Sequence, residues 1–144
     1  MNKHGWIVFG FLTLLAAAEA GAALAEPGDL TGRWRTAEGA TVEIDACGAS
    51  ICGHIVDSPE IAANPDLMDA RNKDPAQRGR RLKNLVILSG FRREGAAWVG
   101  GRAYDPHNGG TYAASLRLAD PGTLKLTGCI ALGLCETQAW TRAR

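Results

Sequence analysis

The chain has 144 residues, of which 46% are hydrophobic and 22% are charged, and its formal net charge at neutral pH is +1. This length suits one domain, and a charge so close to zero argues against a nucleic-acid binder, which normally carries a basic excess. The four cysteines are an even number, which in an exported chain is typical of two disulfides.

Residues 1–25 have the features of a cleavable secretory signal. Lys3 precedes an apolar stretch over residues 5–18, which is shorter than the roughly 20 residues that span a bilayer. The last three residues, Ala-Leu-Ala, form an A-x-A cleavage pattern before Glu26. We therefore expect a signal helix that is removed, a single mature domain of residues 26–144, and a periplasmic or secreted location. An uncleaved anchor helix is the alternative, and after cleavage we expect no stable insertion into a membrane.

Short segments that alternate polar and apolar residues follow, and they predict an all-β fold. The first three predicted strands are residues 32–36, 41–45 and 51–56. Gly48 predicts a hairpin between the second and the third. In that hairpin Val42 and Ile44 should point inward, whereas His54 is expected on the outer face near Glu43, with a place inside the cavity as the alternative.

The segment 57–82 interrupts this pattern with several turn signals that contain proline. One or two helical turns are expected at residues 65–71 or 75–80. A loop of this length in a compact domain is often functional, so we expect it to cover the mouth of the fold.

Three polar side chains of this loop, Asp69, Asn72 and Arg80, allow two interpretations. The favoured one is a network that satisfies itself and pins the loop. The functional one is a polar rim that selects an anionic or polar ligand head group. Tyr104 and Tyr112 have the same ambiguity, because a tyrosine can pack with its hydroxyl bonded or can line a pocket. These five residues are the predicted ligand-binding set.

Regular strands then resume. Five more are predicted, at residues 84–91, 97–104, 111–118, 123–129 and 136–142. The Arg92–Gly95 sequence is expected to be a turn, and the Gly100-Gly101 pair predicts a bulge. About eight antiparallel strands in sequential order can close into a barrel, which removes exposed edges and has room for side chains or one small ligand.

The four cysteines allow three pairings. Local pairing of Cys47 with Cys52 and of Cys129 with Cys135 closes two small loops and is favoured over the crossed pairings. A metal site is the less favoured alternative, because the spacings C-x4-C and C-x5-C differ from the usual zinc knuckles.

Motifs spread over nearly all of the mature chain resemble DUF2147, a family of exported bacterial proteins. The matching residues are Gly32-Arg33-Trp34, Cys47, Cys52-Gly53, Asp69, Asn72, Arg80, Trp98-Val99-Gly100-Gly101, Tyr104-Asp105-Pro106, Gly109, Thr111-Tyr112, Leu124, Gly128-Cys129 and Gln138-Ala139-Trp140-Thr141-Arg142. The family usually has Arg-Pro-Leu followed by Gly where the loop re-enters the barrel, and residues 80–84 lack that Pro and Gly. The resemblance implies a small barrel similar to lipocalins and other calycins, and it implies no agreed activity.

The first strand also resembles the lipocalin G-x-W signature. In that signature the Trp closes the barrel floor and a basic side chain near the last strand covers its indole ring, a role that Arg142 could take over Trp34. The predicted barrel-closing residues are Gly32, Trp34, Trp140 and Arg142. Trp98 and Trp140 are expected in the core.

No catalytic constellation is visible. Paired carboxylates and a nucleophile elbow are absent, and His54 and His107 are not spaced as metal ligands, so we expect no enzyme, metal or cofactor. The favoured function is a carrier of one small apolar or amphipathic molecule inside the barrel, in a cavity of roughly 300 Å³ or more. A barrel filled by large side chains would exclude that carrier. It would favour an interaction module of the cell envelope, while an enzyme that uses the polar loop residues is the third hypothesis.

Overall fold

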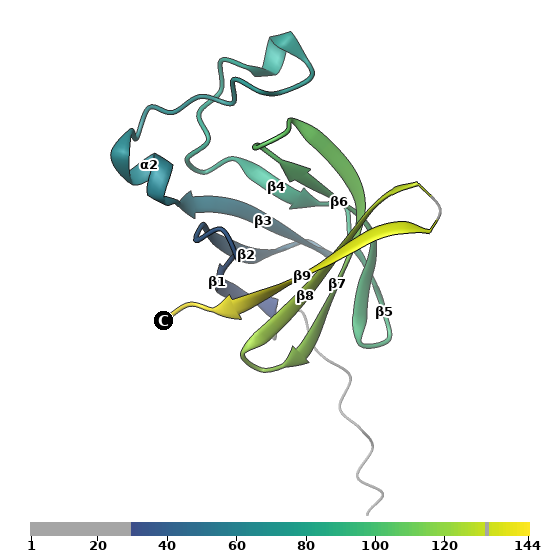
Figure 1. Cartoon of the computed structure of the whole chain (residues 1–144). Helices are drawn as coiled ribbons and strands as arrows, with labels where there is room; N and C mark the ends of the chain where they lie inside the picture. The colour runs from purple at the N-terminus through teal and green to yellow at the C-terminus, as the bar shows by residue number, and fades with distance from the viewer. Residues whose placement is uncertain (1–29, 132) are drawn as a thin grey trace, which may run out of the picture.

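The computed structural model describes residues 30–131 and 133–144, so the predicted signal helix lies outside the described residues. The strands are β1 (Gly32–Arg35), β2 (Thr41–Cys47), β3 (Ser50–Asp57), β4 (Val86–Ser89), β5 (Arg92–Glu94), β6 (Ala97–Asp105), β7 (Gly110–Asp120), β8 (Thr123–Ala131) and β9 (Leu134–Arg142). They form one antiparallel sheet in the order β4-β3-β2-β1-β9-β8-β7-β6-β5. Because β4 also pairs with β6, all strands except β5 close into an eight-stranded barrel (Figure 1). The prediction of an all-β antiparallel barrel is confirmed.

The short strand β5 corrects one prediction. The Arg92–Gly95 sequence was predicted as a turn, but its first three residues pair with Val99, Trp98 and Ala97 of β6. The turn itself needs only two residues, and Gly95 adopts the positive φ of 60° that such tight hairpin turns require. A three-residue strand is too short to show an alternating pattern, so it is not visible in the sequence.

The two ends of the barrel differ. One end holds the start of β1, the end of β9 and the turn between β7 and β8, and we call it the tryptophan end because Trp34 closes it. The opposite end holds the turn at residues 36–40, the long segment between β3 and β4, and the turn at residues 105–110, and we call it the loop end (Figure 1).

Large side chains fill the interior toward the tryptophan end. Strand alternation places the buried residues on the inner face, as predicted for Val42 and Ile44, both of which are fully buried. The core also contains Trp34, Trp98, Trp140, Phe91, Leu88, Ile51, Leu116 and Leu124. A neighbouring side chain also fills the space beside Gly101, because a Cβ at this glycine would overlap the Phe91 ring. Toward the loop end the inward positions are small or polar and only partly buried, as at Ala103, Tyr112 and Gln138.

The predicted bulge lies in β6. The pairing of β6 with β7 shifts between Trp98 and Gly101, and Gly100 has a φ of 68°. A side chain at Gly100 would also overlap the guanidinium of Arg92. Glycine at position 100 therefore permits both the left-handed backbone conformation of the bulge and the close approach of the Arg92 side chain.

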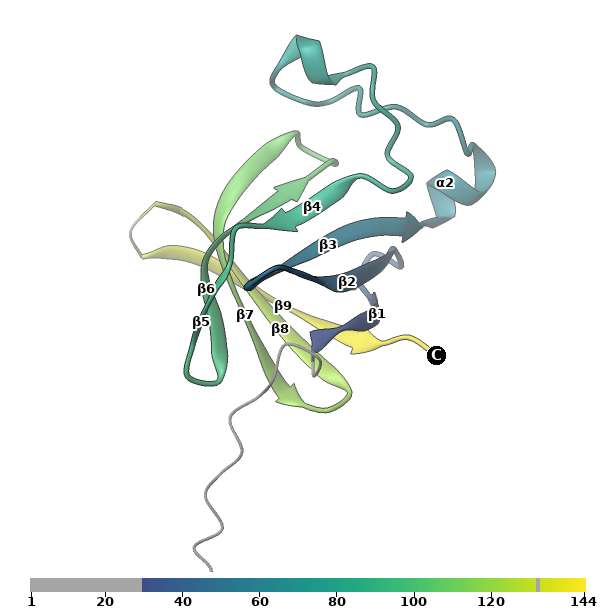
Figure 2. The ribbon, with the colours of Figure 1, turned by 180° about the vertical axis from the view of Figure 1, so that it is seen from behind.

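The long segment is more ordered than the turn signals predicted. Its helix α2 (Pro59–Ala63) begins earlier than the predicted helical turn at residues 65–71, because Ser58 caps it by accepting a hydrogen bond from the Ile61 amide and Pro59 occupies the first turn. A 3₁₀ turn, η1 (Pro75–Gln77), confirms the second predicted position. Figure 2 shows from behind that the whole segment lies beyond the loop end.

Backbone contacts tie this segment to itself and to the barrel. Met68 and Arg81 form an isolated bridge, so the two sides of the segment run antiparallel to each other. Asn84, where the segment re-enters the barrel, adopts a φ of 65°, which asparagine tolerates better than most residues. Within the described ranges, no helix is long and apolar enough to cross a membrane.

Both favoured disulfides are present. Cys47 pairs with Cys52 in the β2–β3 hairpin, and Cys129 pairs with Cys135 in the β8–β9 hairpin. The described chain has no free cysteine. The first bridge lies toward the tryptophan end and the second toward the loop end, so each staples one hairpin and leaves the strand pairing between hairpins to hydrogen bonds and packing.

Candidate functional site

Trp34 and Arg142 close the tryptophan end, as predicted. Trp34 is fully buried, and its Nε1 donates a hydrogen bond of 2.9 Å to the Leu30 carbonyl. The Arg142 guanidinium lies 4.2 Å from the centroid of the Trp34 ring and donates to the carbonyls of Pro121 (2.8 Å) and Thr31 (3.0 Å). A Cβ at Gly32 would approach Arg142 to 3.3 Å, so this glycine leaves room for the guanidinium. A ligand site must therefore lie elsewhere.

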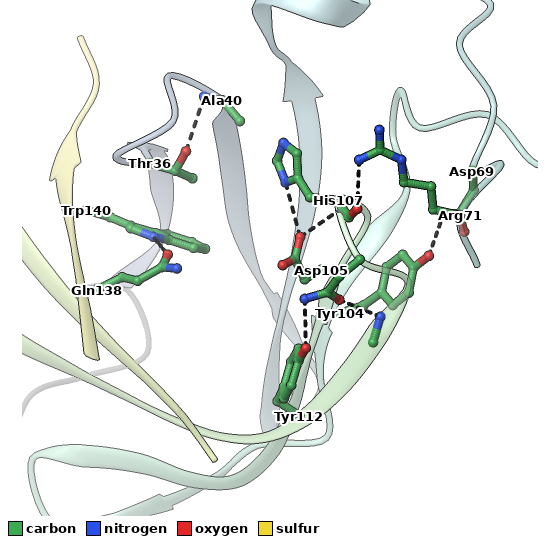
Figure 3. A network of polar contacts seen from close by, with 12 residues as sticks. Thr36, Ala40, Asp69, Arg71, Tyr104, Asp105, His107, Tyr112, Gln138 and Trp140 are labelled. Carbon is green, nitrogen blue, oxygen red and sulfur yellow. Dashed lines mark hydrogen bonds and ion pairs between the residues drawn. The ribbon is translucent and has the colours of Figure 1, made fainter. Parts of the chain in front are cut away.

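Trp140, which was also predicted to close the barrel, lies in the packed core. It is buried in the core like Trp98, as predicted for both, and its Nε1 donates to the Gln138 side chain (3.2 Å). Figure 3 shows this pair beside the turn where Ala40 donates to the Thr36 hydroxyl. The indole therefore has its polar atom satisfied while the ring fills the interior.

Asp69 organises the long segment. Its side chain is completely buried and accepts hydrogen bonds from the Tyr104 hydroxyl (2.5 Å), Asn72 Nδ2 (2.9 Å), and Arg80 Nε (3.2 Å) and Nη2 (3.1 Å). Its backbone amide also donates to the Arg80 carbonyl. Four of the five predicted ligand-binding residues thus meet in one network, which fastens the loop to β6.

This network favours a neutral Tyr104. Burial of the phenol, together with the hydrogen bond to Asp69 and the negative charge of that carboxylate, raises the pKa of Tyr104 to about 12. The Arg80 guanidinium, 5.6 Å from the Tyr104 ring centroid, balances the buried Asp69 charge. Tyr104 is therefore a hydrogen-bond donor at neutral pH.

The titration of Tyr104 tests this geometry. The chain has two tyrosines, so Tyr112→Phe leaves Tyr104 as the sole phenol, and we expect it to ionise near pH 12. Because its pKa is raised in the folded state, the associated stability is fully present below pH 10 and is lost as pH rises from 10 to 12. Absorbance at 295 nm after a rapid pH jump measures the midpoint, and a midpoint near 10 would contradict the buried network.

Tyr112 lies apart from the other four residues. Its hydroxyl accepts from Asn108 Nδ2 (2.8 Å), and Figure 3 shows the two tyrosines with their hydroxyls directed to different partners. In the same turn Asp105 accepts from the His107 amide (2.9 Å) and so caps the turn, while His107 is exposed. Arg71 donates to the His107 carbonyl (2.8 Å) and so ties the long segment to this turn.

A hollow of about 340 Å³ lies under the long segment, and we call it the sub-loop hollow. It is on the outer face of the barrel, because Arg102 and Tyr104 alternate with Ala103, whose strand partner Leu88 is in the core. Its lining comprises Asn72, Gln77, Arg80, Val86, Ile87, Ser89, Arg102, Tyr104 and Thr111.

A second hollow of about 510 Å³ lies beside it on the outer side of β6, β7 and β8. Its lining comprises Gly100, Gly101, Arg102, Thr111, Tyr112, Ala113, Ala114, Ser115, Thr127 and Cys129, most of which are small. Arg102 and Thr111 line both hollows, so the two form neighbouring parts of one surface.

Sequence reasoning missed six residues that line the sub-loop hollow. They are Gln77, Val86, Ile87, Ser89, Arg102 and Thr111. One signal could have indicated the hollow: residues 85–88 are apolar without alternation, which is typical of a strand covered on both faces. The outer cover proves to be the long segment.

Histidines and acidic residues form no metal site within residues 30–131 and 133–144. His54 lies on the outer face, as favoured, with Nε2 4.0 Å from Glu43 and Nδ1 3.9 Å from Asp45. These contacts make a surface charge cluster, which Arg33 extends by pairing with Glu43 at 3.5 Å.

The eight-stranded antiparallel barrel and its Trp–Arg closure form a lipocalin-like fold. A family model described as an uncharacterized protein conserved in bacteria, DUF2147, matches residues 32–142, and the chain belongs to this family. The solved structure of protein HP1028 from Helicobacter pylori, described as belonging to the lipocalin family, is similar with a TM-score of 0.71. That similarity covers 80% of this chain and 83% of the other at 23% identity, and it establishes the fold alone. No curated protein matches the chain.

Proposed function

We propose that this protein is exported and binds one small amphipathic molecule in the sub-loop hollow. The observation that carries the proposal is the composition of the hollow, which combines an apolar wall of Val86 and Ile87 with the polar side chains of Asn72 and Gln77. Its volume of about 340 Å³ falls in the range of small-molecule sites, roughly 300–1,000 Å³. The exposed fraction of Val86 is 52%, so this apolar surface is available to a ligand.

The large side chains packed in the interior favour a ligand site on the outer face over one inside the barrel. Three tryptophans and Phe91 are buried in the interior. The outer hollow, by contrast, has a floor formed by β4, β6 and β7 and a roof supplied by a pinned loop. A pre-formed site of this kind binds with less loss of conformational entropy than a mobile loop would.

Binding fits the polar groups better than catalysis does. The Tyr104 hydroxyl donates a hydrogen bond to the Asp69 carboxylate. The raised pKa of Tyr104 also keeps the phenol protonated at neutral pH, which makes it a poor base or nucleophile. The export part of the proposal is supported by the two disulfides, which persist in oxidising compartments.

An interaction module of the cell envelope is the second candidate. The β8–β9 hairpin exposes Ile130 and Leu134, at 70% and 61% of their surface. An envelope partner that buries this tip, in a protein that carries no small molecule, would favour that function.

One preparation tests the proposed function. The full chain is expressed with its leader and purified from the periplasm, where an intact mass that starts at Glu26 with both disulfides formed verifies export. The neutral apolar dye N-phenyl-1-naphthylamine is then titrated and its fluorescence recorded. We expect saturable binding at one site, weakened about 5-fold by Val86→Asn, because a lost apolar contact of about 1 kcal/mol changes affinity by that factor.

The matched control is Ile130→Asn, which also replaces an exposed β-branched residue but lies outside both hollows. It should leave dye binding unchanged. Equal binding by wild type and Val86→Asn, with both variants folded, would reject the sub-loop hollow as the site.

A further inference from the structure

Arg102 is placed where both hollows meet. Its strand partners are Ser89 of β4 and Ala113 of β7, and its side chain is on the outer face. No hydrogen bond or ion pair engages its guanidinium among residues 30–131 and 133–144. The other arginines around the loop end are engaged: Arg71 donates to the His107 carbonyl and Arg78 donates to the Asn72 carbonyl.

The roof over Arg102 carries a positive excess. Residues 66–83 contain six basic and three acidic side chains, although the whole chain is close to neutral. All three acidic groups are already occupied, because Asp69 holds Arg80, Asp66 pairs with Arg81 at 2.8 Å, and Asp74 caps η1. The segment therefore carries a formal charge of +3 beside a hollow that is lined by Arg80 and Arg102 and by no carboxylate, and this charge attracts an anion.

Hydroxyl donors lie around the same guanidinium. Ser89 is directly opposite Arg102 across the β4–β6 pair, and Thr111 is opposite Tyr104, two residues along β6 from Arg102. Both line the sub-loop hollow, together with the uncharged phenol of Tyr104. An arginine fork flanked by hydroxyl groups suits the oxygen atoms of a carboxylate or a phosphate.

We propose that Arg102 is the anion-binding residue of this site, so that the ligand is an anionic amphiphile. Its carboxylate or phosphate group pairs with Arg102 and accepts from Ser89 and Thr111, while its short apolar body lies on Val86 and Ile87. This assignment rests on the proposed function and names the ligand class for the same hollow. The second hollow, which shares Arg102, gives room for a ligand with a larger polar part.

Four probes with one apolar chain and different head groups test the assignment: octanoate, octyl phosphate, octanol and octylammonium. Affinities are measured by calorimetry on the exported protein, and ¹H–¹⁵N spectra follow the arginine Nε–H signals. We expect octanoate or octyl phosphate to bind at least 10-fold more tightly than octanol and octylammonium, and the tighter of the two identifies the anionic group. The affinity should fall as salt rises.

Arg102→Gln should remove this preference, whereas Arg117→Gln should keep it. Arg117 is another exposed arginine, on the outer face of β7, and it lines neither hollow. If octanol binds as tightly as octanoate and Val86→Asn weakens the binding of both, the sub-loop hollow is still the binding site, but the assignment of Arg102 as an anion-binding residue fails. If none of the four probes binds, both proposals fail. An unchanged preference in Arg102→Gln also overturns the assignment.

Discussion

Replacing Trp34 with alanine is expected to lower the free energy of unfolding by about 3–5 kcal/mol, the usual cost of truncating a buried tryptophan. The side chain is fully buried, donates to the Leu30 carbonyl and supports the Arg142 guanidinium. The alanine would leave a cavity at the tryptophan end, an unpaired carbonyl and an arginine without its ring. Urea unfolding followed by far-UV circular dichroism, with the disulfides intact, measures the loss.

The variant Trp34→Phe separates the contribution of the indole N–H donor from that of the aromatic ring. It retains an aromatic ring under Arg142 but lacks the Nε1 donor, so we expect a smaller loss of about 1–2 kcal/mol from the unpaired buried carbonyl and the reduced volume. A loss below about 1.5 kcal/mol for Trp34→Ala would show that the closure is not a main source of stability.

The elements that the sequence predicts correctly are those with local causes. Residues 41–45 and 111–118 alternate because one face of each strand packs on the core, and Val42, Ile44, Ala114 and Leu116 on these faces are buried. Neighbouring cysteines pair because their hairpins already bring them together. Arg142 over Trp34 is a long-range contact, and it was predictable because a family signature carries both residues.

The candidate site depends on contacts that no local pattern records. Tyr104 and Asp69 are 35 residues apart, and their hydrogen bond decides that the loop lies against β6. Residue types in the loop indicated a polar network, and that network is present. The network lies outside the barrel, where Val86 and Arg102 line the hollow beneath the loop. This placement depends on the pairing of β4 with β6, which the sequence pattern does not reveal.

Asp69→Asn is expected to lower the free energy of unfolding by about 2–3 kcal/mol. The change keeps the shape but turns a carboxylate oxygen into an NH₂ group that faces donors on Arg80 and Asn72. Breaking a fully buried ion pair typically costs about 3–5 kcal/mol, and the lower value is expected here because 39% of the Arg80 side chain is exposed and regains water. Urea unfolding at pH 7 measures the difference.

The loop itself offers a matched control, Asp66→Asn, which removes an exposed partner of Arg81 at 2.8 Å. Surface pairs contribute about 0–1 kcal/mol, so this variant should unfold almost like the wild type. Hydrogen exchange should show Asp69→Asn alone releasing the amide of residue 82, which donates to the Leu67 carbonyl and joins the two sides of the loop. Because Asp69 also fastens this roof to Tyr104, dye affinity should fall in Asp69→Asn and persist in Asp66→Asn. Equal stability and equal dye affinity in the two variants would mean that the buried network does not hold the site together.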